Sequence, residues 1–163
     1  MSPLVSRALD IARGEVGVRE VGRNRGQRVE EYQKAVGLLP GDPWCAAFVC
    51  WAFVRAAEEM GEPCPIPKGG AVNKLWRRAP EDMRRMGPAP GYVFIRYSNP
   101  ANPYSLGHTG IVESISFEGI WTIEGNTDDG GSREGDGVYR RLRPLDYVNI
   151  GYIRPRGYLD LVA

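Results

Sequence analysis

The stretch DPWCAAFVCWAFV at residues 42–54 decides the fold of this chain. Nearly every residue after the proline is apolar, and a helix that is apolar on all faces is buried on all sides. Asp42 suits the N-cap of this helix and Pro43 its first position, while Gly61 ends it. We therefore expect a helix over residues 43–60 that is buried on all sides from Trp44 to Val54, turns polar from Arg55, and has a cysteine in its first turn.

Predicted helices precede predicted strands along the chain. Apolar residues at helical spacing indicate helices in the first half, and short apolar runs between turn residues indicate strands after Gly87. The expected helices cover residues 3–13, 27–36, 43–60 and 71–78, and the expected strands cover residues 92–97, 108–117, 120–124, 137–142 and 150–154. This order favours an α+β fold with a mostly antiparallel sheet. We expect one domain over residues 1–163, with its core at about 15–155.

Composition and charge exclude several classes of function. The chain has 163 residues and a formal net charge of +1, and it has no stripe of basic and aromatic residues for nucleic acid. No apolar run is long enough to cross a bilayer, and Arg7, Asp10 and Arg13 interrupt the apolar region that a signal peptide needs. We expect a monomer that is synthesised in the cytoplasm and does not insert into a membrane.

The three cysteines, an odd number that does not suit a disulfide framework, lie in different settings. Cys45 falls in the first turn of the buried helix, where unpaired N–H groups and the helix dipole favour a thiolate. Cys50 lies deep in the apolar stretch and Cys64 between two prolines, and both suit the role of a small buried hydrophobe. Taken alone, Cys45 suits that role and the role of a nucleophile equally well.

His108 is the only histidine, and therefore the only side chain that ordinarily acts as a base near neutral pH. Downstream of it, Glu124 and Asn126 are two residues apart, so in extended chain they point to the same face. One of them could hold the imidazole tautomer while the other anchors an amide or the oxyanion region. The competing interpretation of Gly125-Asn126 is a simple turn.

Metal binding is the alternative use of these residues. Five helical steps place Cys45 and Cys50 about 140° apart around the helix, which does not suit a shared zinc ion. Neither the Asp128-Asp129 stretch nor the region of Asn24 matches a full calcium loop. We expect no metal and no other cofactor.

The motifs together resemble the CHAP family, the cysteine- and histidine-dependent amidohydrolases/peptidases of bacterial and phage cell-wall lysis. The similarity runs over most of the chain. Its segments are GVRE at 17–20, PWCAAFV at 43–49, GHTGIV at 107–112, IEGNT at 123–127 and GYIRP at 151–155. Three central motifs in this order are a far more specific signal than any one of them alone.

This resemblance implies a papain-like fold of the CHAP/NlpC type, in which the helix that carries the nucleophile packs on an antiparallel sheet. Carried over by position, Cys45 is the nucleophile, His108 the general base and then acid, and Glu124 the group that orients His108. Asn126 is a supporting polar residue. The implied substrate is peptidoglycan, cleaved at an amide in its stem peptide, in its cross-bridge or between sugar and peptide.

Further residues are expected at the substrate groove. We expect Trp44, Gly107 and Tyr104 to contact the substrate. Three other aromatic residues are alternatives for the groove, although core packing explains them better: Trp76, Tyr97 and Trp121.

Calcium and the biological setting follow from the same resemblance. Some members of the family bind calcium through an acidic cluster, which Arg23, Arg25 and Arg28 replace here, so calcium is not supported. We expect a phage endolysin that acts on the cell wall or in the periplasm after release. The alternatives are a secreted interbacterial amidase toxin, with an immunity protein as partner, and a non-catalytic wall-binding or virion module.

Overall fold

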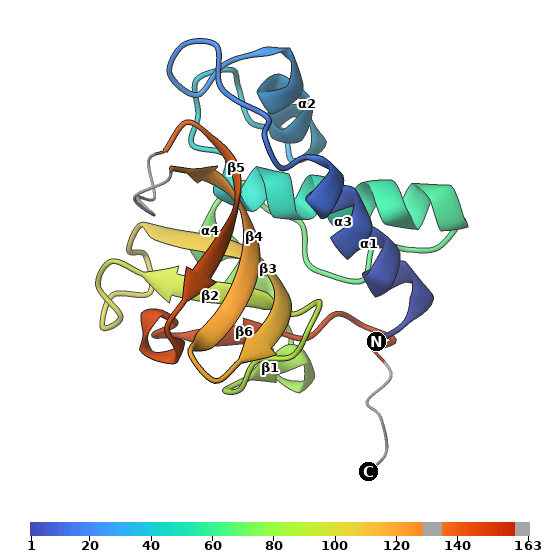
Figure 1. Cartoon of the computed structure of the whole chain (residues 1–163), viewed down its shortest axis with the longest axis vertical. Coiled ribbons are helices and arrows are strands. Elements are labelled where there is room, and N and C mark those ends of the chain that lie inside the picture. Colours follow the sequence, from blue (N-terminus) through green and yellow to red (C-terminus); the bar gives the residue numbers. More distant parts are fainter. Residues whose placement is uncertain (129–134, 159–163) are drawn as a thin grey trace.

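The apolar helix predicted from the sequence is the central element of the computed structural model, which describes residues 1–128 and 135–158. Within these residues the helices are α1 (Pro3–Gly14), α2 (Gln27–Ala35), α3 (Cys45–Met60) and α4 (Val72–Arg78), with 3-10 turns η1 (Glu81–Met83) and η2 (Leu145–Tyr147). The strands are β1 (Arg84–Arg85), β2 (Val93–Tyr97), β3 (Gly107–Ser116), β4 (Gly119–Thr127), β5 (Gly137–Arg143) and β6 (Gly151–Ile153). The predicted α+β class is confirmed (Figure 1).

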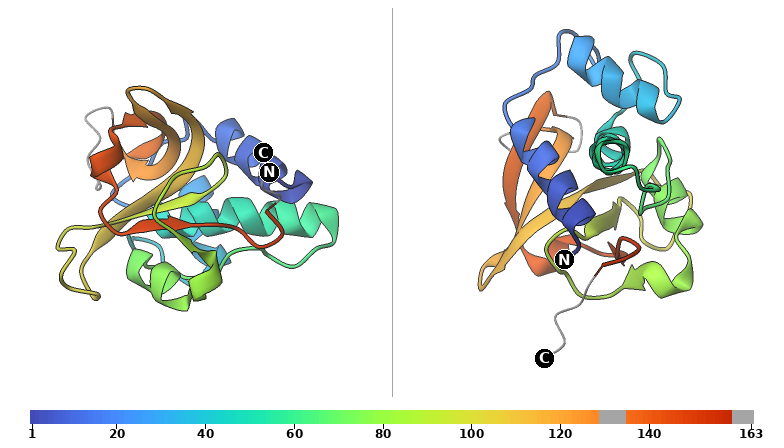
Figure 2. Two further views of the ribbon diagram at one scale, coloured as in Figure 1. Left: turned by 90° about the horizontal axis from the view of Figure 1, so that it is seen from below. Right: turned by 90° about the vertical axis from the view of Figure 1, so that its right-hand side faces the viewer.

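The strands form one antiparallel sheet in the order β1-β6-β2-β3-β4-β5. Side chains alternate between its two faces. One face packs on α3 through residues such as Val93, Ile111 and Ile123, and the other gathers a smaller apolar cluster around Phe94 and Val112. Figure 2 shows that the sheet is strongly curved. His108 and Glu124, the catalytic candidates on the strands, belong to the face that turns away from α3.

Helices α1 and α2 pack against α3 on the sides that the sheet leaves open (Figure 2). The contact residues of α1 follow helical spacing, as the sequence predicts, and are buried: Leu4, Val5, Ala8, Leu9 and Ala12. Tyr32 of α2 packs its ring against Trp44 and Phe48, while its hydroxyl donates to the carboxylate of Glu15. The aromatic contacts thus fix the N-terminal end of α3, where Cys45 lies.

The predicted N-cap of α3 is wrong. The helix begins at Cys45, and the residue before it, Trp44, provides no side-chain cap. The carboxylate of Asp42 instead accepts a hydrogen bond from the backbone N–H of Leu39 at 2.9 Å, which closes the preceding turn. The competing local bond wins because a short acidic side chain readily binds backbone groups of its own turn. The first turn of α3 therefore has no side-chain acceptor for its N–H groups.

Two strands also differ from the prediction. Strand β4 runs on to Thr127, because the chain continues through Gly125 and Asn126 with a shift in register toward β5 rather than ending in a turn. The two-residue strand β1 pairs with β6 and was not expected. None of the helices within residues 1–128 and 135–158 has the length and apolar character that spanning a membrane requires. The single-domain assignment stays a prediction.

Candidate active site

Cys45 is the first residue of α3 and is almost buried, with 7% of its surface exposed. Its exposed part contributes to the wall of a hollow of about 310 Å³. The first N–H groups of the helix point toward its N-terminal end, where the thiol lies, and no N-cap side chain accepts a hydrogen bond from them. This end carries positive helix-dipole charge, which suits an anion at the sulfur or an oxyanion beside it.

His108 and Glu124 come from neighbouring strands, β3 and β4, and are fully buried. The imidazole Nε2 lies 2.7 Å from Oε2 of Glu124. When Nε2 carries the proton that this bond needs, the other ring nitrogen, Nδ1, is the free base. Nδ1 makes no hydrogen bond among the described residues, so it is free to exchange a proton with a neighbouring thiol. The structure thus brings His108 and Glu124 into contact, and the role of Glu124 in orienting a catalytic His108 stays a prediction.

The glycine at position 110 makes this contact geometrically possible. Gly110 precedes Ile111 of β3, which pairs with Ile123 of β4, and a Cβ atom at Gly110 would meet Cγ of Glu124 at 2.7 Å. The side chain of Glu124 therefore crosses the space that any other residue would fill, and from there it reaches diagonally to His108. A glycine in a strand often marks such a close approach.

The two buried partners shift each other's protonation. Burial lowers the pKa of the His108 imidazole, but its interactions with Cys45 and Glu124 outweigh burial and raise the pKa to about 9. Burial raises the pKa of the Glu124 carboxyl, whereas hydrogen bonds from Arg143 and His108 lower it to about 2. At neutral pH the site therefore favours an imidazolium beside an ionised carboxylate.

Glu124 has two further partners that sequence reasoning missed. Thr122 donates its hydroxyl to Oε1 at 2.6 Å, and Arg143 donates to both carboxylate oxygens. Thr122 could have been found from its place two residues before Glu124, on the same face of a strand. Arg143 lies in the arginine-rich stretch of β5, which looks like a solvated face from sequence alone.

The loop before Cys45 is fixed by polar contacts to the N-terminal region. Trp44 is fully buried, and its indole N–H donates to Oε1 of Glu20 at 2.7 Å. The side-chain amide of Gln33 donates to the backbone carbonyls of Asn24 and Asp42. The expectation that Trp44 touches substrate needs correction, because its ring is fully buried, does not line the hollow and stacks on Tyr32, where it fixes the start of α3.

The hollow at Cys45 lies between loops of the helical part and the start of β3. Its apolar wall comes from Leu38, Val72 and Leu106, and Gly107 completes it. A Cβ atom at Gly107 would lie 2.3 Å from the carbonyl oxygen of Arg96, so no residue with a side chain fits at this position. Gly107 can therefore offer only its backbone to a ligand. We interpret this hollow as the substrate groove.

The expected aromatic contacts are not part of this lining. Tyr104 is 68% exposed and stacks under the guanidinium of Arg77, next to the groove rather than in it. Tyr97 is buried, and the rings of Trp76 and Trp121 pack against arginine side chains. Core or surface packing thus explains these aromatic residues within the described chain.

Asn126 occupies the irregular end of β4 with a positive φ of 56°. Its side chain is buried, and Oδ1 has no hydrogen-bonding partner among the described residues. It contributes to a second hollow of about 350 Å³ together with Glu20 and Arg23. Asn126 is therefore close to the site but not bonded to His108, and its supporting role stays a prediction.

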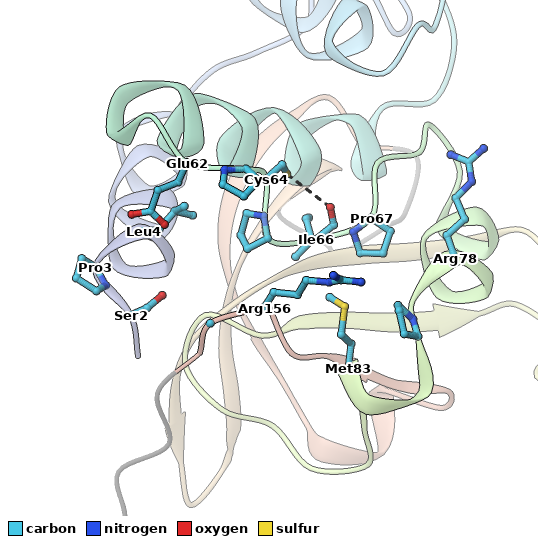
Figure 3. A pocket seen from close by; sticks show the side chains of 14 residues that line it. Ser2, Pro3, Leu4, Glu62, Cys64, Ile66, Pro67, Arg78, Met83 and Arg156 are labelled. Atoms are coloured by element: carbon cyan, nitrogen blue, oxygen red, sulfur yellow. Dashed lines mark hydrogen bonds between the residues drawn. The ribbon is translucent and has the colours of Figure 1, made fainter.

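A roomier hollow of about 520 Å³ lies elsewhere and contains neither Cys45 nor His108 (Figure 3). Leu4 and Glu62 stand at one end, and Arg156 extends across it beside Met83. Cys64 belongs to its wall, and its Sγ lies 3.6 Å from the carbonyl of Ile66. The lining of this hollow includes Glu62 but no histidine, whereas Cys45 at the smaller hollow interacts with His108.

Burial decides the role of Cys50, and the arrangement of possible ligands decides whether a metal ion could bind. Cys50 is fully buried, and this burial raises its pKa to about 12, so it stays a neutral thiol. Residues 1–128 and 135–158 contain no group of three or more His, Cys, Asp or Glu side chains arranged to hold a metal ion. Asp129 lies outside the described residues.

Comparisons with known proteins concern the fold and the family of this chain. Two solved structures are similar: "The crystal structure of Ly7917", with a TM-score of 0.52 and 19% identity over 93% of this chain, and "The crystal structure of Ly7917 with the hydrolyzing product of MDP", with a TM-score of 0.50 and 20% identity over 94%. The present chain spans 62% and 63% of those two chains. At such identities the similarity concerns the fold, which is consistent with the papain-like arrangement. No curated protein matches the sequence.

The family assignment comes from the sequence of the central region. The model of the CHAP domain matches residues 39–126, which is more than half of the chain. This range contains Cys45, His108, Glu124 and Asn126. The chain therefore belongs to the CHAP domain family.

Proposed function

We propose that this protein is a peptidoglycan hydrolase that cleaves an amide bond of the wall peptide by a cysteine-histidine mechanism. The observation that carries the proposal is the buried Glu124–His108 contact of 2.7 Å, which leaves Nδ1 for the thiol of Cys45. Membership of the CHAP family supports the substrate class. A similar structure was solved with the hydrolyzing product of MDP, which gives further support.

In the first half of the proposed reaction, the Cys45 thiolate attacks the amide carbonyl carbon, and the carbonyl π electrons move onto oxygen. N–H groups in the uncapped first turn of α3 stabilise this oxyanion. The imidazolium of His108 then donates its Nδ1 proton to the leaving nitrogen as the C–N bond breaks. A thioester on Cys45 and a free amine result.

In the second half, neutral His108 accepts a proton from water as the water oxygen attacks the thioester. Collapse of the second tetrahedral intermediate breaks the C–S bond and releases a carboxylic acid. Glu124 does not take up the proton at either step. Its ionised carboxylate keeps Nε2 protonated and stabilises the imidazolium.

The groove supports a peptide rather than a flat aromatic ligand as substrate. Its wall is largely apolar but carries the polar groups of Asp42 and Asn73, and Cys45 is part of it. Such a mixture suits an extended peptide with small side chains and free backbone amides. We propose an N-acetylmuramoyl-L-alanine amidase or an endopeptidase, and the product masses distinguish the two.

The direct test is digestion of purified peptidoglycan and of MDP, with products identified by mass spectrometry. The wild-type protein should release new amine and carboxyl termini, Cys45→Ala should release none, and Cys64→Ala should behave as wild type. Cys64 is a matched control because it is a thiol in the same chain that is not at the groove. Equal products from wild type and Cys45→Ala would overturn the mechanism.

For the biological setting we propose a phage endolysin that acts on the wall after release. The toxin alternative predicts a tight inhibitory protein partner, and that partner would protect walls from digestion. The binding-module alternative predicts that the protein sediments with walls from several species but releases no termini. The same digestion therefore separates the enzyme from the binding module.

A further inference from the structure

Arg143, the last residue of β5, binds the same carboxylate of Glu124 that His108 contacts. Its Nε donates to Oε1 at 2.8 Å and its terminal NH2 group donates to Oε2 at 2.6 Å. The arginine is 7% exposed and Glu124 is fully buried. Two parallel charge-assisted bonds of this kind define both the position and the plane of a carboxylate.

Each carboxylate oxygen of Glu124 accepts two hydrogen bonds. Oε1 accepts from Thr122 and Arg143, and Oε2 accepts from Arg143 and His108. A carboxylate held by only one neighbour could rotate about its last bond and lose the imidazole. With Arg143 in place, rotation would break two buried charged bonds at once.

The charged and titratable groups around the Arg143–Glu124 pair come from every neighbouring element. Tyr147 of η2 places its ring 4.2 Å from the guanidinium of Arg143, and Arg96 of β2 packs against the same ring at 4.5 Å. Asp128 adds a further favourable charge to Arg143. The remaining groups are His108 of β3, Glu124 of β4 and Cys45 of α3. The ring of Phe94 packs against both Tyr147 and His108.

We propose that Arg143 is a positioning residue of the hydrolase, which holds the Glu124 carboxylate in the plane of His108 and offsets part of its negative charge. The proposal rests on the proposed cysteine-histidine function. No comparison or sequence motif assigns a role to Arg143.

The charge offset has a definite consequence for His108. A buried carboxylate alone would stabilise the imidazolium so strongly that it would donate its proton to a leaving amine only with difficulty. The nearby guanidinium repels the imidazolium and weakens this stabilisation. Arg143 thus keeps His108 acidic enough to protonate the leaving group and basic enough to accept the proton of water.

The test compares Arg143→Met, which removes the charge but keeps an apolar stem, with Arg143→Lys, which keeps the charge but loses the fork. Arg140→Met is the matched control, because Arg140 lies on the same strand but pairs with Glu113 at the surface. His108 is the only histidine, so its ring signals in an NMR pH titration need no assignment. Circular dichroism and thermal melting confirm that each variant is folded.

In Arg143→Met we expect the NMR midpoint of His108 to rise by about one pH unit or more above wild type, because the repelling charge is gone. The acid limb of kcat/KM should also move to higher pH, since Glu124 loses the cation that keeps it ionised. In Arg143→Lys and Arg140→Met the midpoint should stay at the wild-type value. Arg143→Lys should lower kcat by about 10-fold or more with little change in KM, because the plane of the carboxylate is no longer fixed.

An unchanged midpoint and unchanged pH limbs in Arg143→Met would overturn the proposal. If that variant does not fold, Arg143→Lys decides, and a wild-type kcat in it would overturn the positioning role. A merely structural role would lower the folded fraction and scale the activity without moving the pH limbs. The NMR midpoint needs no substrate, so a failure of the proposed hydrolysis, seen as Cys45→Ala with wild-type activity, is recognised separately.

Discussion

Adding one methyl group at Gly110 should disable the site without removing any polar group from it. The new Cβ would lie 2.7 Å from Cγ of Glu124 and 2.8 Å from both the carbonyl oxygen of Ile123 and Cε1 of Phe94. The carbonyl belongs to the backbone of the paired strand, so relieving this contact shifts the strand, and relieving the contact with Cγ moves the side chain of Glu124. Cγ needs about 0.7 Å to reach an ordinary contact of 3.4 Å, and the carboxylate at its far end moves away from His108 with it.

The expected loss follows from this displacement. A misplacement of about 1 Å in a catalytic constellation costs about 100-fold in rate, which corresponds to about 2.7 kcal/mol in the activation barrier. Overpacking a core by one methyl group costs about 1 to 3 kcal/mol of stability, and a domain with about 5 to 15 kcal/mol stays folded after that loss. Gly110→Ala should therefore be folded and about 100-fold less active.

The assay is the initial rate of peptidoglycan solubilisation beside a thermal melt of each protein. Gly87→Ala is the control, because a Cβ there meets no atom within 4 Å and its φ is not positive. It should keep wild-type activity. An activity of Gly110→Ala within about twofold of wild type would refute the argument that Glu124 crosses the sheet through the space of this glycine.

Two further predictions concern protonation and the loop before the nucleophile. The rate should fall above pH 9, where His108 with its pKa raised to about 9 loses the proton that the leaving amine needs. In a pH series of chemical unfolding, the stabilisation from His108 should be complete below its ordinary pKa of 6.5 and be lost as the pH rises through 9. The stabilisation from Glu124, whose pKa is lowered to about 2, should be complete above its ordinary pKa of 4.5 and be lost as the pH falls toward 2. A rate of hydrolysis that does not change between pH 8 and 10 would contradict the expected fall above pH 9. Trp44→Phe loses the bond to Glu20 and should lower the free energy of unfolding by about 1.5 to 3 kcal/mol, measured by urea denaturation, and a change below about 0.5 kcal/mol would show that this bond does not hold the loop.

Much of the fold could be predicted because its elements carry strong local signals. The buried helix α3 is apolar on all faces, and strand β2 is a short apolar run after a Pro-Gly turn. The two-residue strand β1 carries no such signal, since its arginines pair with β6 only after the chain has folded. The predicted cap at Asp42 failed because a nearby N–H, that of Leu39, competes for the same carboxylate.

The site was only partly predictable for a related reason. The order of Cys45, His108 and Glu124 indicates their chemistry, and the structure brings His108 and Glu124 into contact. The fork of Arg143 depends on β5 lying next to β4, and this pairing spans residues that no local pattern connects. The burial of Trp44 likewise depends on Glu20 and on the packing of α2, so its role behind the groove needs the tertiary structure.

The central claim is that Cys45 is the nucleophile of a wall hydrolase. The most direct measurement is mass spectrometry of purified peptidoglycan after digestion by the wild-type protein and by Cys45→Ala, with circular dichroism to establish that both are folded. We expect new termini at one type of amide bond from the wild type and none from Cys45→Ala. The same fragments from both proteins, or none from the wild type on walls of several chemotypes, would contradict it.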